Sequence, residues 1–318
     1  MKSSVREVLG FLGLNEPVGR DFPLVRASPP TDVSDGTLTL VTRKAESLPG
    51  LFRNAAADVL VFAHSSLREQ SKPLPQVFLF SDNPRLMFCR ALNHFLSEPF
   101  VPQIADSAVI RTSKPLNRLV RIGAGCVISG DVTIGDRTEI EPLVTISGKV
   151  TIGCEVYIKS GTVIGQKGFG FERDDKGTPV LFPQLGGVRI GNRVEVGALN
   201  TIARGALGDT VVSDDVKTDD HVHIAHNVQI GPRCLITAGA VIAGSVRIGS
   251  DVWIGPNATT TNDIEIRRGA QISLGAVVVR NVKPGQRVSG NFAEPHEKFL
   301  ERYLTITLPR ELNQSESH

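Results

Sequence analysis

The chain has few of the features that mark membrane, secreted or nucleic-acid-binding proteins. Aromatic residues make up 5% of its 318 residues, and its four cysteines lie far apart without a CxxC pair. No apolar run approaches the roughly 20 residues of a membrane-spanning helix, and Met1–Glu7 lacks the apolar stretch of a signal peptide. The 35 basic side chains nearly balance the 33 acidic ones, which excludes a strong field directed at nucleic acid or anionic lipid. We therefore expect a cytoplasmic protein with free thiols, no membrane span and no nucleic-acid partner.

The most informative feature that is present is a six-residue period. In steps of six from Ile104 to Ile164, eleven positions hold ten isoleucines and one leucine. The period breaks, returns at Ile190, and after a slip of four residues continues from Val212 to Val278. A small or β-branched residue commonly stands two positions before each of these, and glycine often follows. Such a repeat is interpreted first, because it decides the whole fold.

This spacing predicts a parallel β-helix. Two inward side chains separated by one outward residue form a short strand, and the glycine and polar residues after them allow a tight corner. Three such units make a coil of about 18 residues, whose isoleucines stack on the next coil at the ~4.8 Å spacing of neighbouring strands. A six-residue period fits neither an α-helix nor a simple alternation. The expected fold class is therefore mainly β, a parallel β-helix of hexapeptide repeats.

The repeat divides the chain into three regions. Residues 1–100 lack the period and are expected to form a small α/β domain. Residues 101–283 form the β-helix, and residues 284–318 hold a C-terminal helix, expected over 294–304, and a polar tail.

Two local signals refine this division. In the first region three apolar runs are typical of buried strands, and Asn83-Pro84 predicts the start of a helix. In the β-helix, residues 165–188 form an excursion that lacks the repeat. Long loops on a rigid scaffold commonly carry function, and a hydrophobic plug between subunits is an equal alternative for this one.

Three of the seven histidines lie together, at His221, His223 and His226. Such a group suggests zinc, but the inward positions of Val222 and Ile224 turn His221 and His223 outward and place His226 at a corner. No thiol and no suitably spaced further ligand accompanies them, so we predict no metal. An outward histidine near acidic side chains is better suited to act as a general base. A solvated or interface histidine is the alternative.

A glycine is expected beside the corner histidine. At about 18 residues per coil, Gly244 stacks on His226, and its bare backbone N–H can approach a ligand. A base next to an amide donor is the pair that acyl transfer requires, one to deprotonate the nucleophile and one to hold the oxyanion. Flat faces with outward polar residues favour threefold packing, so we expect a homotrimer with sites between subunits.

Several motifs follow one another in an order that resembles a known family. They are GFGF at 168–171, FPQLG at 182–186, RGAL at 204–207, IAHN at 224–227 and AGS at 243–245. With Asn83-Pro84-Arg85-Leu86, they resemble the UDP-3-O-acylglucosamine N-acyltransferases of lipid A biosynthesis, which are left-handed β-helix acyltransferases. The resemblance implies a left-handed helix, with His226 as the base and the Gly244 amide as the oxyanion hole. It also implies that the domain at residues 1–100 is similar to a nucleotide-sugar-binding domain.

The resemblance further implies transfer of an acyl group from a thioester to the amino group of a nucleotide-linked amino sugar. His223 or Asp219 would orient the base. The residues expected to contact the substrate are Phe169, Phe171, Gln184, Asn227 and Arg43. No bound cofactor is expected, because the acyl thioester, on an acyl carrier protein or on CoA, is a cosubstrate.

The sequence also departs from the family pattern. The aromatic residues that grip uracil are absent from 40–46, Asp263 stands in place of a second histidine, and Ala203 replaces an aspartate. The methionines that set acyl-chain length are missing around 274–279, and the last coil resembles CoA-dependent sugar acetyltransferases. We favour a carrier-protein donor, because the ordered motifs outnumber this one match. The alternatives are a CoA-dependent short-chain N-acyltransferase, a non-catalytic β-helix scaffold and a zinc β-helix of the carbonic anhydrase type.

Overall fold

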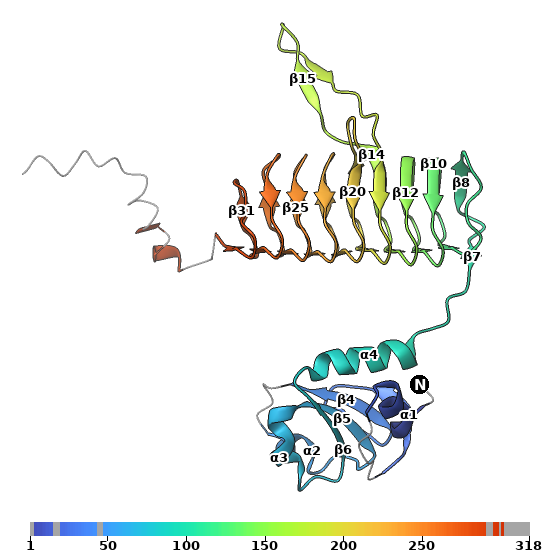
Figure 1. Ribbon diagram of the computed structural model, residues 1–318, viewed down its shortest axis with the longest axis vertical. Helices are drawn as coiled ribbons and strands as arrows, with labels where there is room; N and C mark the ends of the chain where they lie inside the picture. Colours follow the sequence, from blue (N-terminus) through green and yellow to red (C-terminus); the bar gives the residue numbers. More distant parts are fainter. Residues whose placement is uncertain (1–2, 15–19, 43–46, 291–294, 299, 302–318) are drawn as a thin grey trace, which may run out of the picture. The chain divides into compact units, whose positions relative to one another are not determined.

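The computed structural model describes residues 3–14, 20–42, 47–290, 295–298 and 300–301. It divides into two compact units, Met1–Pro99 and Phe100–His318 (Figure 1). Of the C-terminal helix expected over 294–304, the structure describes residues 295–298 and 300–301, and 296–298 and 300–301 are helical. The rest of that range lies outside the described residues. Within the described part of the chain, no helix is long and apolar enough to cross a membrane.

The N-terminal unit is a parallel sheet with helices. Its strands pair in the order β3 (Arg26–Ala27), β4 (Thr37–Val41), β5 (Val59–His64) and β6 (Val77–Ser81). Helix α4 (Pro84–Leu96) starts where Asn83-Pro84 predicts, and the Asn83 Oδ1 accepts the Leu86 N–H at 3.1 Å. The remaining elements are β1 (Ser3–Ser4), α1 (Val5–Phe11), β2 (Pro23–Leu24), α2 (Leu48–Phe52), the 3-10 turn η1 (Ser65–Leu67) and α3 (Arg68–Ser71).

The second unit is a parallel β-helix with three faces (Figure 1). Face A comprises β8 (Val109–Thr112), β14 (Val163–Lys167), β19 (Thr201–Arg204), β22 (His223–Ile224), β25 (Val241–Ile242), β28 (Thr259–Thr260) and β31 (Val277–Val278). Face B comprises β17 (Val188–Ile190), β20 (Thr210–Val212), β23 (Gln229–Ile230), β26 (Arg247–Ile248) and β29 (Glu265–Ile266). Strands β10 (Val127–Ile134) and β12 (Thr145–Ile152) run from face A into face B.

Face C forms a separate sheet of ten strands. These are β7 (Gln103–Ile104), β9 (Arg121–Ile122), β11 (Glu139–Ile140), β13 (Tyr157–Ile158), β18 (Glu195–Val196), β21 (Lys217–Thr218), β24 (Leu235–Ile236), β27 (Trp253–Ile254), β30 (Gln271–Ile272) and β32 (Arg287–Val288). The chain visits the three faces in turn, so that each strand pairs with the strand one coil further on.

The predicted isoleucine ladder forms the core of this unit. Ile128 pairs with Ile146, Ile224 with Ile242 and Ile236 with Ile254, and all of these side chains are buried. Shortening one of them to alanine in such a core typically costs about 2–5 kcal/mol, because both the buried surface and the packing are lost. The predicted fold class, a mainly β, left-handed parallel β-helix, is confirmed.

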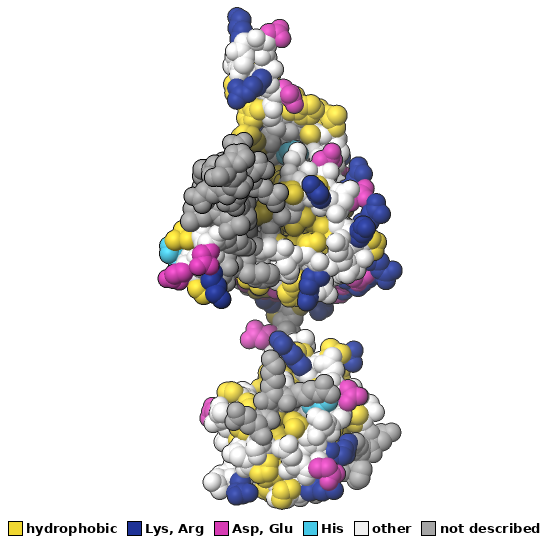
Figure 2. All heavy atoms as spheres, turned by 90° about the vertical axis from the view of Figure 1, so that its left-hand side faces the viewer, with side chains coloured by type: hydrophobic (Ala, Val, Ile, Leu, Met, Phe, Trp, Pro, Cys, Tyr) yellow, Lys and Arg dark blue, Asp and Glu magenta, His cyan; other side chains and the backbone are white. Residues whose placement is uncertain are grey.

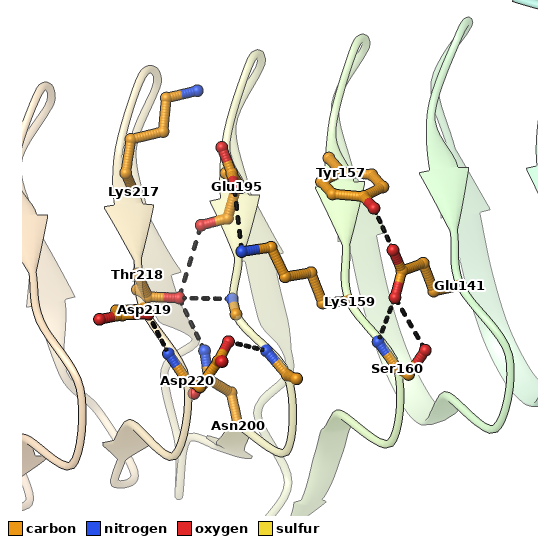
Figure 3. A network of polar contacts seen from close by, with 12 residues as sticks. Glu141, Tyr157, Lys159, Ser160, Glu195, Asn200, Lys217, Thr218, Asp219 and Asp220 are labelled. Atoms are coloured by element: carbon orange, nitrogen blue, oxygen red, sulfur yellow. Dashed lines mark hydrogen bonds and ion pairs between the residues drawn. The ribbon is translucent and has the colours of Figure 1, made fainter. Parts of the chain in front are cut away.

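One coil carries a polar interior in place of the apolar ladder (Figure 3). The buried Asn200 donates from Nδ2 to the Thr218 Oγ1 at 2.7 Å and accepts the Val222 N–H at 2.5 Å. Thr218 Oγ1 also accepts the Gly197 N–H at 3.1 Å. Here the ladder partners Thr201 and His223 stand 22 residues apart. These side-chain hydrogen bonds satisfy the buried polar groups inside the coil.

The excursion at 165–188 is an arm that projects from the β-helix (Figure 1). Its outer part is an antiparallel pair, β15 (Phe171–Arg173) and β16 (Pro179–Leu181). Its returning end is fastened to the RGAL loop: the Leu185 N–H donates to the Ala206 carbonyl at 2.6 Å, and the Gly187 N–H donates to the Asp209 carboxylate at 2.8 Å. Figure 2 shows charged side chains at the tip of the arm and hydrophobic side chains at its base.

Candidate active site

His226 lies at the corner that follows β22, and its imidazole is enclosed between two glycines. A Cβ atom on Gly244, one coil further on, would lie 2.7 Å from Cε1 and 2.8 Å from Nε2 of the imidazole. A Cβ on Gly168, at the start of the arm, would lie 2.7 Å from the His226 Cβ. Because contacts this short leave no room for a methyl group, the ring fits only where both neighbours lack a side chain. The predicted stacking of Gly244 on His226 is confirmed.

Asn227 fixes which nitrogen of His226 carries the proton. Its Oδ1 lies 3.1 Å from the His226 Nδ1 and also accepts the Ala206 N–H at 3.0 Å. A carboxamide oxygen only accepts hydrogen bonds, so Nδ1 of the neutral ring is the donor. Nε2, on the side of Gly244, is then the nitrogen that can take up a proton. Asn227 has a φ of +63°, a left-handed conformation that asparagine tolerates better than most residues.

A groove of about 680 Å³ on face A contains this histidine. Its floor comes from β14, β19, β22 and β25, and the arm contributes Lys167, Gly168 and Phe169. The lining is mostly apolar, with Val163, Val241 and several alanines. Among the described residues nothing accepts a hydrogen bond from the Gly244 N–H, so this donor is available to a ligand beside the imidazole.

His223 lies in the same groove, as a second imidazole. Its Nδ1 is 2.6 Å from the Thr201 Oγ1 on the neighbouring strand. Desolvation in the groove lowers the pKa of His223 below its ordinary value, because burial disfavours the charged ring. His223 therefore favours its neutral form more than a free imidazole does, and it lies in the groove three residues from His226.

Asp219 does not reach this groove, so the structure does not support its expected role of orienting His226 within the same chain. It follows β21 on face C, and its carboxylate accepts the N–H of the next residue, Asp220, at 2.9 Å (Figure 3). The physical reason is that seven residues of a β-helix pass from one face to the next. Asn227, expected only to contact substrate, makes the hydrogen bond to the imidazole instead.

Four further residues were expected to contact the substrate, and the structure describes three of them. The rings of Phe169 and Phe171 lie 5.0 Å apart, and Phe169 lines the groove with 86% of its surface exposed. Gln184 is buried in the arm, where its Oε1 has no hydrogen-bond partner among the described residues. Arg43 lies outside the described residues.

The sequence analysis missed two residues that contact these histidines. Gly168 was noted only as part of a motif, and nothing in the pattern shows that it touches His226. Thr201 partners His223 across a coil of 22 residues, so the regular period does not align them. Within the described ranges, no group of three or more His, Cys, Asp or Glu side chains could hold a metal ion.

Comparisons with known proteins find a matching family and several relatives. The family of bacterial transferase hexapeptide (six repeats) matches residues 209–244, which include His226 and Gly244. The UDP-3-O-acylglucosamine N-acyltransferase of Bordetella pertussis is 40% identical over 276 residues, or 79% of this chain and 76% of that protein. The enzyme of the same name from Coxiella burnetii is 39% identical over 242 residues, or 70% of each chain.

Solved structures share the β-helix. The UDP-N-acetylglucosamine acyltransferase of Francisella novicida aligns with a TM-score of 0.54 at 25% identity, covering 63% of this chain and 73% of that one. LpxA from Acinetobacter baumannii aligns with the same TM-score of 0.54 at 23% identity, over 63% of this chain and 77% of that one. The second likeness shows the fold alone.

The lowered pKa of His223 predicts a loss of stability in acid. Since the folded state binds a proton less readily than the unfolded chain, stability is full above the ordinary value of 6.5 and falls as the pH drops below it. When the pH is lowered from 7.5 to 5.5, we expect the melting temperature of His223→Gln to fall less than that of the wild type. His221→Asn, at an exposed corner, is the control and should behave as the wild type. An equal loss in all three proteins would contradict the assignment.

Proposed function

Because this chain belongs to the UDP-3-O-acylglucosamine N-acyltransferase family, we propose that it transfers an acyl group to the amino group of UDP-3-O-acylglucosamine, a step of lipid A biosynthesis. The observation that carries this proposal is the His226 imidazole between Gly168 and Gly244, with Nδ1 held by Asn227 and Nε2 left free. The acyl donor is a thioester, and we favour one carried by an acyl carrier protein.

The residues support a base and an oxyanion hole. In this proposal, the amine nitrogen of the sugar attacks the thioester carbonyl while Nε2 of His226 takes a proton from that amine. The Gly244 N–H donates to the oxyanion that forms. The C–S bond then breaks as the amide bond is completed, and the imidazolium returns the proton to the leaving thiolate. Asn227 holds the ring in the tautomer that this sequence needs.

Other residues of the groove and arm have proposed contacts with the substrates. Phe169 and Phe171 offer apolar surface next to the groove, and the buried Gln184 Oε1 is an unused acceptor. His223 presents an imidazole in the same groove, and burial lowers its pKa. For Arg43 the proposal of a substrate contact rests on the sequence alone.

The choice of donor depends on the last coils. Leu274, Val277 and Val279 are 61%, 59% and 62% exposed, an apolar surface that supports a bound acyl chain. The sequence likeness of the same coils to acetyltransferases favours CoA and a short chain. We favour the carrier protein, in line with the family to which the chain belongs.

A homotrimer is also part of this proposal. The groove is open along one side of face A, and a flat face of outward Val127, Thr145 and Val241 suits packing against another copy. Light scattering is expected to give three times the 34.2 kDa of one chain. A monomer at micromolar concentration would contradict both the trimer and a site shared between subunits.

The role of His226 predicts a specific loss of turnover. We expect His226→Ala to lower turnover by roughly 10²–10⁴-fold, the usual contribution of a general base, while its melting temperature stays near that of the wild type. Gly244→Ala should also lower turnover, because the added methyl group would lie 2.7 Å from the His226 Cε1. His221→Asn is the matched control. If His226→Ala retained wild-type turnover, His226 would not be the base of the reaction.

The donor is tested by supplying each thioester separately. With UDP-3-O-acylglucosamine as acceptor, we expect release of free thiol from 3-hydroxyacyl carrier protein and little from acetyl-CoA. Turnover with acetyl-CoA alone would overturn the choice of donor and leave the assignments of His226 and Gly244 in place.

A further inference from the structure

The groove on face A carries positive charge and no acid. Of its fourteen lining residues, all within the described part of the chain, none is Asp or Glu. Lys167 is its one ammonium group, and the side chains of Gln166, Thr201 and the two histidines are its other polar groups. Such a lining attracts an anionic ligand, since the apolar walls screen the charge less than water does.

Lys167 has no counterion among the described residues. It forms none of the ion pairs found there, and the carboxylate of Asp209, at the root of the arm, is engaged by Arg189 at 3.2 Å and by the Gly187 N–H at 2.8 Å. The unneutralised charge of Lys167 is therefore left for a ligand.

A second cation lies directly opposite Lys167. Lys167 of β14 pairs with Arg204 of β19 in the parallel ladder, and Arg204 likewise forms no ion pair in the described ranges. Arg204 is used structurally: its Nε donates to the Gly165 carbonyl at 2.6 Å, and its guanidinium lies over Gly148. Neither side chain has a carboxylate partner in the described part of the chain, so an anion held by Lys167 would lie near a second positive charge.

The backbone next to Lys167 adds donors. Within the described residues the N–H groups of Gly168, Phe169 and Gly170 donate no hydrogen bond, and Gly168 and Phe169 border the groove. Consecutive free amides beside a cation are a common arrangement for binding phosphate groups.

We propose that Lys167 binds a phosphate ester in this groove and thereby determines substrate specificity. This inference rests on the proposed function, whose substrates offer that chemistry in two places. One is the diphosphate of the nucleotide sugar, and the other is the phosphate of the pantetheine arm of the donor. In either case the ammonium holds the charged group while the reacting atoms lie beside His226.

Binding measurements by calorimetry test this without requiring turnover. The probes are UDP and 4′-phosphopantetheine, with uridine and pantetheine as the counterparts that lack phosphate. We expect Lys167→Gln to weaken one of the two phosphate probes roughly tenfold or more, as befits a lost charged hydrogen bond, and Lys167→Glu to weaken it further. Uridine and pantetheine should be unaffected. The probe that responds identifies the source of the phosphate.

Lys176→Gln is the matched control, because Lys176 lies in the turn between β15 and β16, in the same arm but outside the groove. It should bind both probes as the wild type does. Wild-type affinity of Lys167→Gln for both phosphate probes, or failure of the wild type to bind either, would overturn the proposal. If the wild type binds the probe through Lys167 but transfers no acyl group, the proposed function is contradicted and the binding proposal is not.

Discussion

The structure depends on one constraint, the stacking of successive coils in register through their inward side chains. Because each coil pairs with the next by parallel hydrogen bonds, residues one coil apart are immediate neighbours. The isoleucine ladder holds this register: a slip of a single residue would turn every inward side chain outward. The same stacking places Gly244 against His226, so the site depends on the register as much as the core does.

The groove lies where the regular repeat is interrupted. The arm leaves β14 and returns to β17, and the RGAL loop after β19 lengthens the next coil. These two insertions meet, since the returning end of the arm bonds to Ala206, and Ala206 in turn donates to Asn227. Asn227 then holds His226. A rigid scaffold thus supplies the position of the base, and the insertions supply its environment.

The sequence predicted the parts that follow from the period and missed those that depend on its interruptions. The β-helix, the inward Val222 and Ile224, and the neighbours His226 and Gly244 all follow from counting residues along a coil. The lengthened coil brings Thr201 to His223, and counting at a constant period cannot show this. Asp219, by contrast, lies seven residues before His226 at the regular period, so its position on face C could have been counted from the sequence. The contact of Gly168 with His226 depends on how the arm folds back, which the repeat does not determine. Lys167 was not recognised, because a single exposed lysine at the end of a strand has no distinctive sequence pattern.

The central claim is that Asn227 holds His226 as a base with its free nitrogen beside Gly244. The most direct measurement is nitrogen-15 NMR of histidine-labelled protein at a pH where the imidazoles are neutral, with His226 assigned by comparison with His226→Ala. The account predicts that the proton of the neutral His226 ring is on Nδ1, and that Asn227→Ala, which removes the acceptor, mixes the two tautomers. A wild-type ring with its proton on Nε2 would contradict the account, because no lone pair would then be available beside the Gly244 amide.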